Sequence, residues 1–120
     1  MTLKECYSKM GGDYEAVLGR LRSEDRVRRF ALKFLDDSSF TTLERSMQEQ
    51  DYMEAFRAAH TIKGICQNLS FTRLGDSSHE LTEALRDGVV HPGYDVDALC
   101  GRVREDYQLT SGALMELKES

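Results

Sequence analysis

The sequence predicts an all-α protein, and three observations lead to this class. Its 120 residues contain a single proline, Pro92, so little in the chain interrupts helices. No segment shows the β-branched alternation that is typical of strands. Apolar residues instead recur every three or four positions, which is the spacing of amphipathic helices. We therefore expect an antiparallel four-helix bundle with one or two short additional helices at its N-terminal end.

The first bundle helix is expected to begin after Ser23, an N-cap residue followed by Glu24 and Asp25. Acids in the first turn interact favourably with the helix dipole. The predicted apolar face of this helix consists of Val27, Phe30, Ala31, Phe34 and Leu35. A shorter helix should follow, with a register of Phe40, Leu43 and Met47. Residues 1–22 would form accessory helices across one end, and residues 23–120 the bundle itself, within one structural domain.

Two further helices are predicted between residues 51 and 88. Asp51, with Glu54 three residues later, has the form of a capping box and marks a helix start. The apolar positions that follow form a bundle seam: Tyr52, Ala55, Ala59, Ile62, Cys66 and Leu69. The next helix repeats the spacing through Phe71, Leu74, Ser78, Leu81 and Leu85. Gly88 stands where a C-terminal glycine is expected.

The last helix should run from about Asp95 to Lys118, after the break around Pro92. Its apolar side is predicted from the positions Val96, Leu99, Val103, Tyr107, Thr110, Leu114 and Leu117. The longest non-helical stretch is residues 87–93, and no segment has the composition of an interdomain linker. The short turns favour antiparallel neighbours in the bundle.

Composition narrows the function. With 16 basic and 21 acidic residues the chain carries a net charge of −5, which argues against a nucleic-acid binder. No apolar run approaches the roughly 18 residues of a membrane span, and the N-terminal residues lack a signal-peptide pattern, so we expect a cytoplasmic protein without membrane insertion. The three cysteines, Cys6, Cys66 and Cys100, fit neither a disulfide framework nor a paired zinc motif, and are expected to be reduced structural thiols.

One stripe of residues on the helix that begins at Asp51 does not belong to the predicted core. Successive residues turn about 100°, which places His60, Lys63, Gly64 and Gln67 together on the outward side. Glycine inside an exposed helix costs about 1 kcal/mol relative to alanine, so Gly64 requires a reason. Without a side chain one turn from His60, a bulky partner can approach the imidazole. Neutral imidazole is a nucleophile, and Lys63 supplies a cation for an attached anion, so the stripe indicates a phosphorylatable histidine.

The run Ala59-His60-Thr61-Ile62-Lys63-Gly64 resembles the H-x-x-K-G signature of histidine-containing phosphotransfer (HPt) domains. The resemblance covers the bundle from about Ser23 to Leu117. It implies that His60 accepts a phosphoryl group from an aspartate of a receiver domain and returns it to another. It also implies that Lys63 steadies the phosphoryl oxygens and that Gly64 clears the approach.

The same resemblance implies the partners. They would be a response-regulator receiver domain and a hybrid sensor histidine kinase. The chain would be a phosphocarrier rather than an enzyme and would need no cofactor, because the receiver would bring the aspartate and Mg²⁺.

The chain departs from the family pattern at several positions. A glutamine on the following helix commonly bonds to the histidine in this family, and the corresponding residue here is Thr82, which is shorter. Arg86, one turn further on, matches a basic position of some members. We expect Thr82, Arg86, Gln67 and Arg57 to border the site as binding residues. Phe56, one turn before His60, is read as a residue that packs on the flank of the core or contributes to the binding surface.

Two other functions compete with phosphotransfer. A helical docking module could bind a receiver domain without being phosphorylated, and it would share the same fold and surface. A metal-dependent bundle enzyme would need Glu-x-x-His motifs on two helices, which the sequence lacks, so no metal site is expected. His79 and His91 lie outside the stripe and are read as surface or turn residues.

Overall fold

The computed structural model describes all 120 residues and consists of seven α-helices and two short 3₁₀-helices, without strands. The prediction of an all-α fold is confirmed. The elements are α1 (Leu3–Met10), α2 (Tyr14–Leu21), α3 (Glu24–Lys33), η1 (Phe34–Asp36), α4 (Ser39–Gln48), α5 (Tyr52–Leu69), α6 (Thr72–Ala84), η2 (Arg86–Gly88) and α7 (Val96–Glu119).

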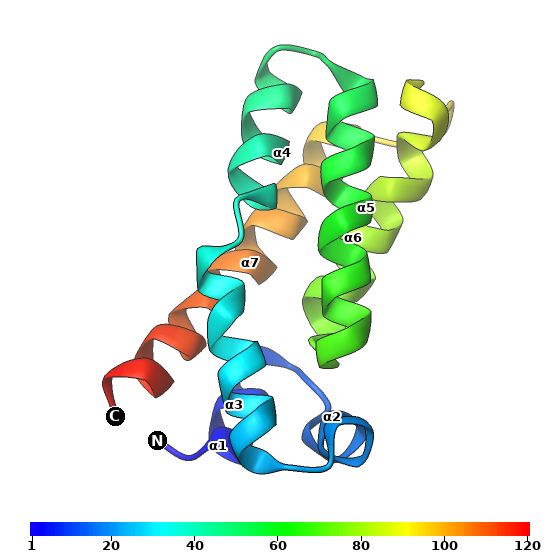
Figure 1. Ribbon diagram of the computed structural model, residues 1–120. Coiled ribbons are helices and arrows are strands. Elements are labelled where there is room, and N and C mark those ends of the chain that lie inside the picture. Colours follow the sequence, from blue (N-terminus) through cyan, green and yellow to red (C-terminus); the bar gives the residue numbers. More distant parts are fainter.

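Three long helices, α5, α6 and α7, make up most of the bundle, and α5 packs against both α4 and α6. The fourth position is filled by α3, η1 and α4, which follow one another along one side (Figure 1). α1 and α2 close the lower end of the bundle, and α1 packs against α7. The two chain ends lie near each other there, and the amino group of Met1 donates a hydrogen bond to Ser120 Oγ at 3.1 Å.

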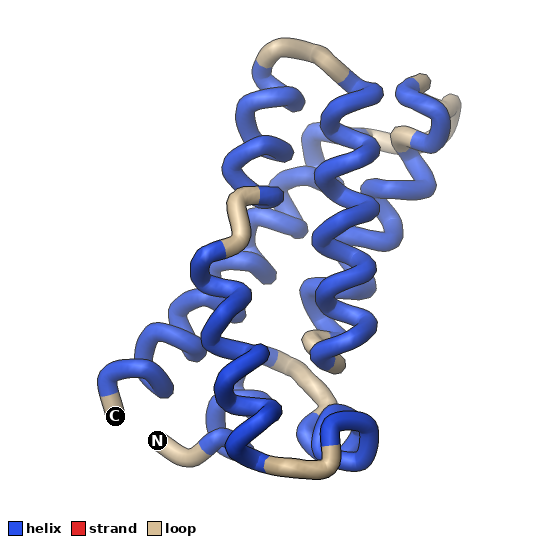
Figure 2. The backbone as a smooth tube through the Cα atoms, viewed as in Figure 1, coloured by secondary structure: helices blue, strands red, loops and turns tan.

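The side of the bundle built from residues 24–48 consists of two helices, as predicted, but the first of them ends earlier than expected. Phe34 and Leu35 were expected to continue the helix after Ser23, but α3 ends at Lys33 and residues 34–36 form a 3₁₀ turn. Asp37 is extended, and its Oδ1 accepts a hydrogen bond from Ser39 N at 2.8 Å, at the start of α4. The loop between the two helices is visible as the tan segment on that side of the tube in Figure 2.

The predicted helix starts are confirmed by their caps. The side chains of Ser23, Asp51 and Asp95 accept hydrogen bonds from backbone N–H groups three residues later, at 3.2, 3.2 and 3.1 Å. The Asp51 cap is not a reciprocal box, because the carboxylate of Glu54 pairs instead with Arg45.

Gly88 was predicted to end the helix that begins near Phe71, and this prediction is wrong. α6 ends at Ala84, and Gly88 instead closes η2 with a φ of +78°. A Cβ there would come within 3.0 Å of the Met53 Cα, so glycine allows η2 to pack on the first turn of α5.

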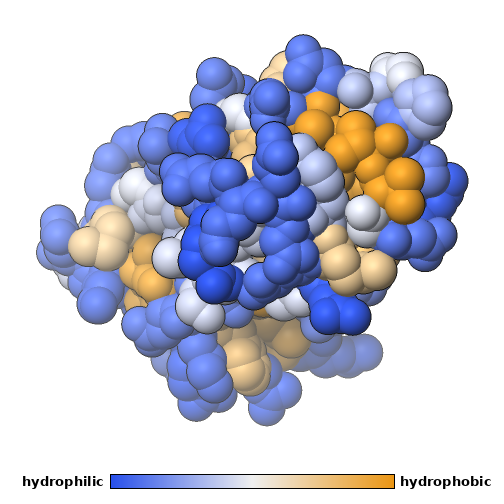
Figure 3. All heavy atoms as spheres, turned by 90° about the horizontal axis from the view of Figure 1, so that it is seen from above, coloured by the Kyte–Doolittle hydropathy of each residue, from blue (hydrophilic) through white to orange (hydrophobic).

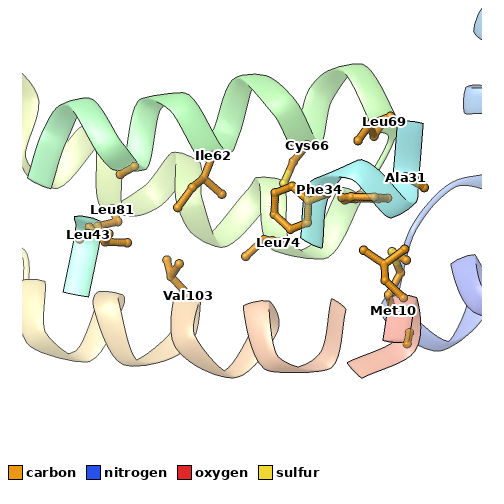
Figure 4. Close-up of a cluster of buried hydrophobic side chains, with 14 of the residues drawn as sticks. Met10, Ala31, Phe34, Leu43, Ile62, Cys66, Leu69, Leu74, Leu81 and Val103 are labelled. Carbon is orange, nitrogen blue, oxygen red and sulfur yellow. The ribbon is translucent and has the colours of Figure 1, made fainter. Parts of the chain in front are cut away.

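One cluster of buried apolar side chains joins all the helices. In Figure 4, Ile62 and Cys66 point from α5 toward Leu74 of α6 and Val103 of α7. The predicted seam of α5 is buried from Ala55 to Leu69, whereas Tyr52 at its start is only half-buried. Because this seam faces the core, the opposite face of α5 is left to solvent.

Phe30 is the one residue of the predicted α3 face that the structure leaves in solvent, at 42% exposure. Val27, Ala31 and Phe34 form the buried stripe, and Phe30 lies about 100° from Ala31 around the helix. Its ring lines a hollow of about 580 Å³ between α3 and the C-terminal turns of α5. The guanidinium of Arg29 lies 5.7 Å from the centre of this ring.

None of the helices combines the length and the apolar composition that crossing a membrane requires.

Candidate functional site

His60 lies near the middle of α5, on the face that points away from the core. Its ring is exposed and takes part in no hydrogen bond. The neighbours Ala58, Ala59 and Ile62 are buried, so the backbone beneath His60 is held by the core while the imidazole faces solvent. The structure thus presents a histidine on a rigid support, with both ring nitrogens free to react.

Gly64 has open space around its missing side chain. A Cβ built at this position meets no atom within 4 Å, in contrast to Gly12 and Gly88, whose added Cβ atoms would be crowded. Its φ lies outside the left-handed region, so neither packing nor backbone geometry requires glycine here. The same open space surrounds the helical glycines Gly19 and Gly112, so what distinguishes Gly64 is its position one turn from the exposed His60.

Two unpaired cations flank His60 on α5. Lys63 is half-buried and Arg57 is exposed, and neither forms an ion pair, although six ion pairs occur elsewhere. The nearest acid on this helix, Glu54, is engaged by Arg45 at 2.6 Å. Gln67 is exposed one turn beyond Lys63 and makes no hydrogen bond. This part of α5 therefore carries local positive charge on a protein whose net charge is −5.

Phe56 is the aromatic neighbour of His60. The centres of the two rings are 6.2 Å apart and their planes are inclined by 27°, an offset stack between residues one turn apart. Phe56 itself is half-buried and packs against the hydrophobic core.

In the structure, Thr82 and Arg86 form hydrogen bonds within their own segment of the chain and none with His60. Thr82 is only 5% exposed, and its hydroxyl donates to the carbonyl of Ser78 on its own helix at 2.7 Å, not to His60. Arg86 belongs to η2 and pairs with Glu83 at 3.0 Å. η2 packs on the first turn of α5 near Met53, about two turns before His60. A threonine hydroxyl within a helix commonly bonds to a backbone carbonyl of the same helix. Aligning Thr82 with the glutamine of other family members could not show this.

The other histidines and the cysteines form no contact with His60 that the structure records. His79 is exposed on α6, and His91 Nε2 lies 2.9 Å from the carbonyl oxygen of Arg86. The three cysteines are free and buried, and burial raises the pKa of the Cys66 thiol to about 12. No three His, Cys, Asp or Glu side chains are grouped so that they could hold a metal ion.

Exposed apolar surface occurs at both ends of the bundle, and sequence periodicity did not identify it. Seen from above (Figure 3), the end formed by the α4–α5 loop and η2 is largely hydrophilic, with a hydrophobic patch on one side. Exposed apolar side chains of the neighbouring segments are Met53 in the first turn of α5 and Val89, Val90 and Tyr94 between η2 and α7. The hollow lined by Phe30 lies at the other end, and Ile65 and Leu69 of α5 also line it.

Comparison with known protein families gives a match to the model described as "Hpt domain", over residues 34–111. The matched region is more than half of the chain and contains α4 to most of α7, with His60, Lys63 and Gly64. Comparisons with curated proteins and with solved structures gave no match.

Proposed function

The chain belongs to the Hpt domain family, and from this membership we propose that it carries a phosphoryl group on His60 between receiver-domain aspartates of a multistep phosphorelay. Members of this family are histidine phosphotransfer modules of phosphorelays. The observation that carries the assignment to His60 is the open space at Gly64 beside an exposed imidazole on a rigid helix. A receiver active site must bring its aspartate to the ring, and the missing side chain leaves that path clear.

The chemistry needs little from this chain beyond a positioned nucleophile. A ring nitrogen of neutral His60 attacks the phosphorus of the aspartyl phosphate, so an N–P bond forms as the acyl O–P bond breaks. The aspartate carboxylate leaves with the electron pair of the broken bond, and the imidazole later releases the proton of its other nitrogen to solvent. Transfer of this kind depends on alignment and charge neutralisation. Lys63, unpaired and one turn from His60, would balance charge on the phosphoryl oxygens.

The partners follow from this chemistry. The donor and acceptor would be receiver domains, one of them part of a hybrid sensor histidine kinase, and each would supply the acidic pocket and the Mg²⁺ that its own chemistry requires. In this proposal the chain is a phosphocarrier and holds no cofactor itself. The unpaired Lys63 and Arg57 support docking to an acidic pocket, because opposite charges accelerate encounter.

The test distinguishes a phosphocarrier from a docking module that is never phosphorylated. The chain is incubated with receiver domains that have been phosphorylated with acetyl phosphate and Mg²⁺, and transfer is followed by the appearance of an acid-labile, base-stable phosphate on the chain. His60→Gln should abolish the signal, and His79→Gln, at another exposed histidine, should retain it.

Because His60 is exposed, its replacement should change the free energy of unfolding by less than about 0.5 kcal/mol. Binding of receivers without any phosphate on the chain would favour the docking module. A His60→Gln protein that still becomes phosphorylated would remove His60 from the assignment.

A further inference from the structure

The orientation of the His60 ring is not set by any hydrogen bond. Neither ring nitrogen has a partner, and the hydroxyl of Thr82 is committed to the carbonyl of Ser78. A nucleophilic nitrogen held loosely would spend only part of its time directed at an incoming phosphorus, and alignment is a large part of the transfer rate. Any restraint on the ring orientation therefore has to come from a contact other than a hydrogen bond.

Phe56 is placed to supply that contact. Side chains of an α-helix tilt toward its N-terminus, so the His60 ring leans back over the turn that carries Phe56. The two ring centres lie 6.2 Å apart at an inclination of 27°. Gly64, on the other adjacent turn, offers no side chain at all, so the imidazole has an aromatic neighbour on one side and open space on the other.

The two rings differ in their own freedom. Phe56 is half-buried against the core, whereas His60 is exposed. A side chain anchored by core packing stays in one rotamer more than an exposed one does. The Phe56 ring can therefore act as a fixed plane against which the mobile imidazole aligns.

We propose that Phe56 is a positioning residue for phosphotransfer, whose ring holds the imidazole of His60 in the orientation that directs a ring nitrogen outward to the receiver. This inference rests on the proposed function of His60. It assigns to an aromatic stack the role that a hydrogen bond to the ring would otherwise fill. Phe56 does not touch the phosphoryl group and acts only through His60.

The expected effect follows from the number of orientations that the stack removes. A helical histidine has about two accessible χ1 wells and two ring orientations about χ2, hence about four arrangements. If Phe56 selects one of them, losing the aromatic plane should lower the rate of transfer by up to about fourfold. The affinity for the receiver should stay the same, since only the population of the reactive arrangement changes.

The experiment compares Phe56→Leu with Phe56→Tyr. Leucine keeps an apolar side chain against the core and removes the aromatic plane, whereas tyrosine retains the plane. Single-turnover transfer from a phosphorylated receiver is measured over a range of receiver concentrations. Phe56→Leu should lower the saturating rate about two- to fourfold without moving the half-saturating concentration. Phe56→Tyr should transfer at nearly the wild-type rate, and so should the control Met53→Leu, which changes an exposed apolar residue of the preceding turn.

Nuclear magnetic resonance gives a second readout that does not need a partner. The ring current of Phe56 should change the chemical shifts of the His60 ring protons. Phe56→Leu should return these shifts toward the values of a free histidine. Circular dichroism checks that the variant is folded, and Phe56→Met repeats both measurements with another apolar shape. Neither measurement depends on which receiver is the natural one.

The outcomes separate this inference from the proposed function. A Phe56→Leu protein with wild-type saturating rate and unchanged His60 resonances would overturn the positioning role. A change confined to the half-saturating concentration would also overturn it, because Phe56 would then be a docking contact. If the wild-type chain accepts no phosphate from any receiver, the proposed function fails. The resonances would still decide whether Phe56 orients the ring.

Discussion

Replacing Gly64 should move stability and activity in opposite directions. A Cβ at this position meets nothing within 4 Å, so alanine adds no clash and removes the entropic cost of glycine in a helix. The gain should be about 1 kcal/mol in the free energy of unfolding. With an unfolding entropy of about 2.1 cal/mol/K per residue over this chain, that gain corresponds to a rise in Tm of about 4 °C.

A longer side chain in place of Gly64 should slow transfer. His60 and Gly64 are one turn apart, a spacing at which Cβ atoms on a helix are separated by about 5–6 Å. Because helical side chains tilt toward the N-terminus, a glutamine introduced at this position would lie over the turn that carries the imidazole. In both favoured χ1 wells it would occupy the path of the receiver. We expect Gly64→Gln to lower single-turnover transfer by at least about tenfold, equivalent to about 1.4 kcal/mol in the barrier.

The matched control for this experiment is Gly112, an exposed glycine of α7 whose missing Cβ also has open space around it. Gly112→Gln should stabilise the helix as much as Gly64→Gln and leave transfer unchanged. Thermal unfolding and single-turnover transfer are measured on both variants. Normal transfer by a folded Gly64→Gln protein would refute the argument that this glycine exists for access. Equal slowing by Gly112→Gln would show that stability alone changes the rate.

Two further predictions concern charge. Lys63→Glu should slow transfer at every ionic strength because it removes the cation beside the phosphoryl oxygens, whereas Arg57→Glu should slow only encounter, so its rate should converge with wild type at high salt. Single-turnover rates across a salt series check this, and full rescue of Lys63→Glu by salt would contradict the role of Lys63. Arg104 of α7 donates hydrogen bonds of 2.6 and 2.8 Å to Glu44 of α4, and these bonds lower the pKa of the Glu44 carboxyl. The pair therefore stabilises the fold fully at pH values above the ordinary carboxyl pKa. This stabilisation is lost as the pH falls through the lowered pKa. Since the two side chains are 45% and 26% exposed, Arg104→Gln should lower the free energy of unfolding by at most about 1 kcal/mol near neutral pH, and by less below about pH 4. Thermal unfolding of both proteins at several pH values measures this difference. An equal loss of stability at every pH would refute the role of the pair.

The helical class, the starts of the main helices and the seam of α5 could be predicted because they depend on local rules. Ser23, Asp51 and Asp95 cap the helices that follow them through their own side chains, and this preference acts within a few residues. The exposure of His60 and Gly64 follows from the same periodicity, since residues opposite a buried seam face solvent. The family could be expected from the H-x-x-K-G run, and the match over residues 34–111 confirms it.

Contacts between elements could not be read from periodicity. Phe30 fits an apolar face in the sequence, yet its exposure depends on where α3 meets α5, which is decided by packing over long sequence separations. Gly88 looks like the end of a helix, but its place is set by the close approach of Met53 from another element.

The surroundings of the His60 imidazole separate what the sequence determines from what only the tertiary structure decides. That His60 points outward is a property of one helix and was determined by the sequence. Which neighbour limits its ring was decided only in the folded chain, because Thr82 turns its hydroxyl to its own backbone and Phe56 is held against the core. Side-chain partners across or along helices depend on rotamers and packing, and these are fixed only when the tertiary structure forms.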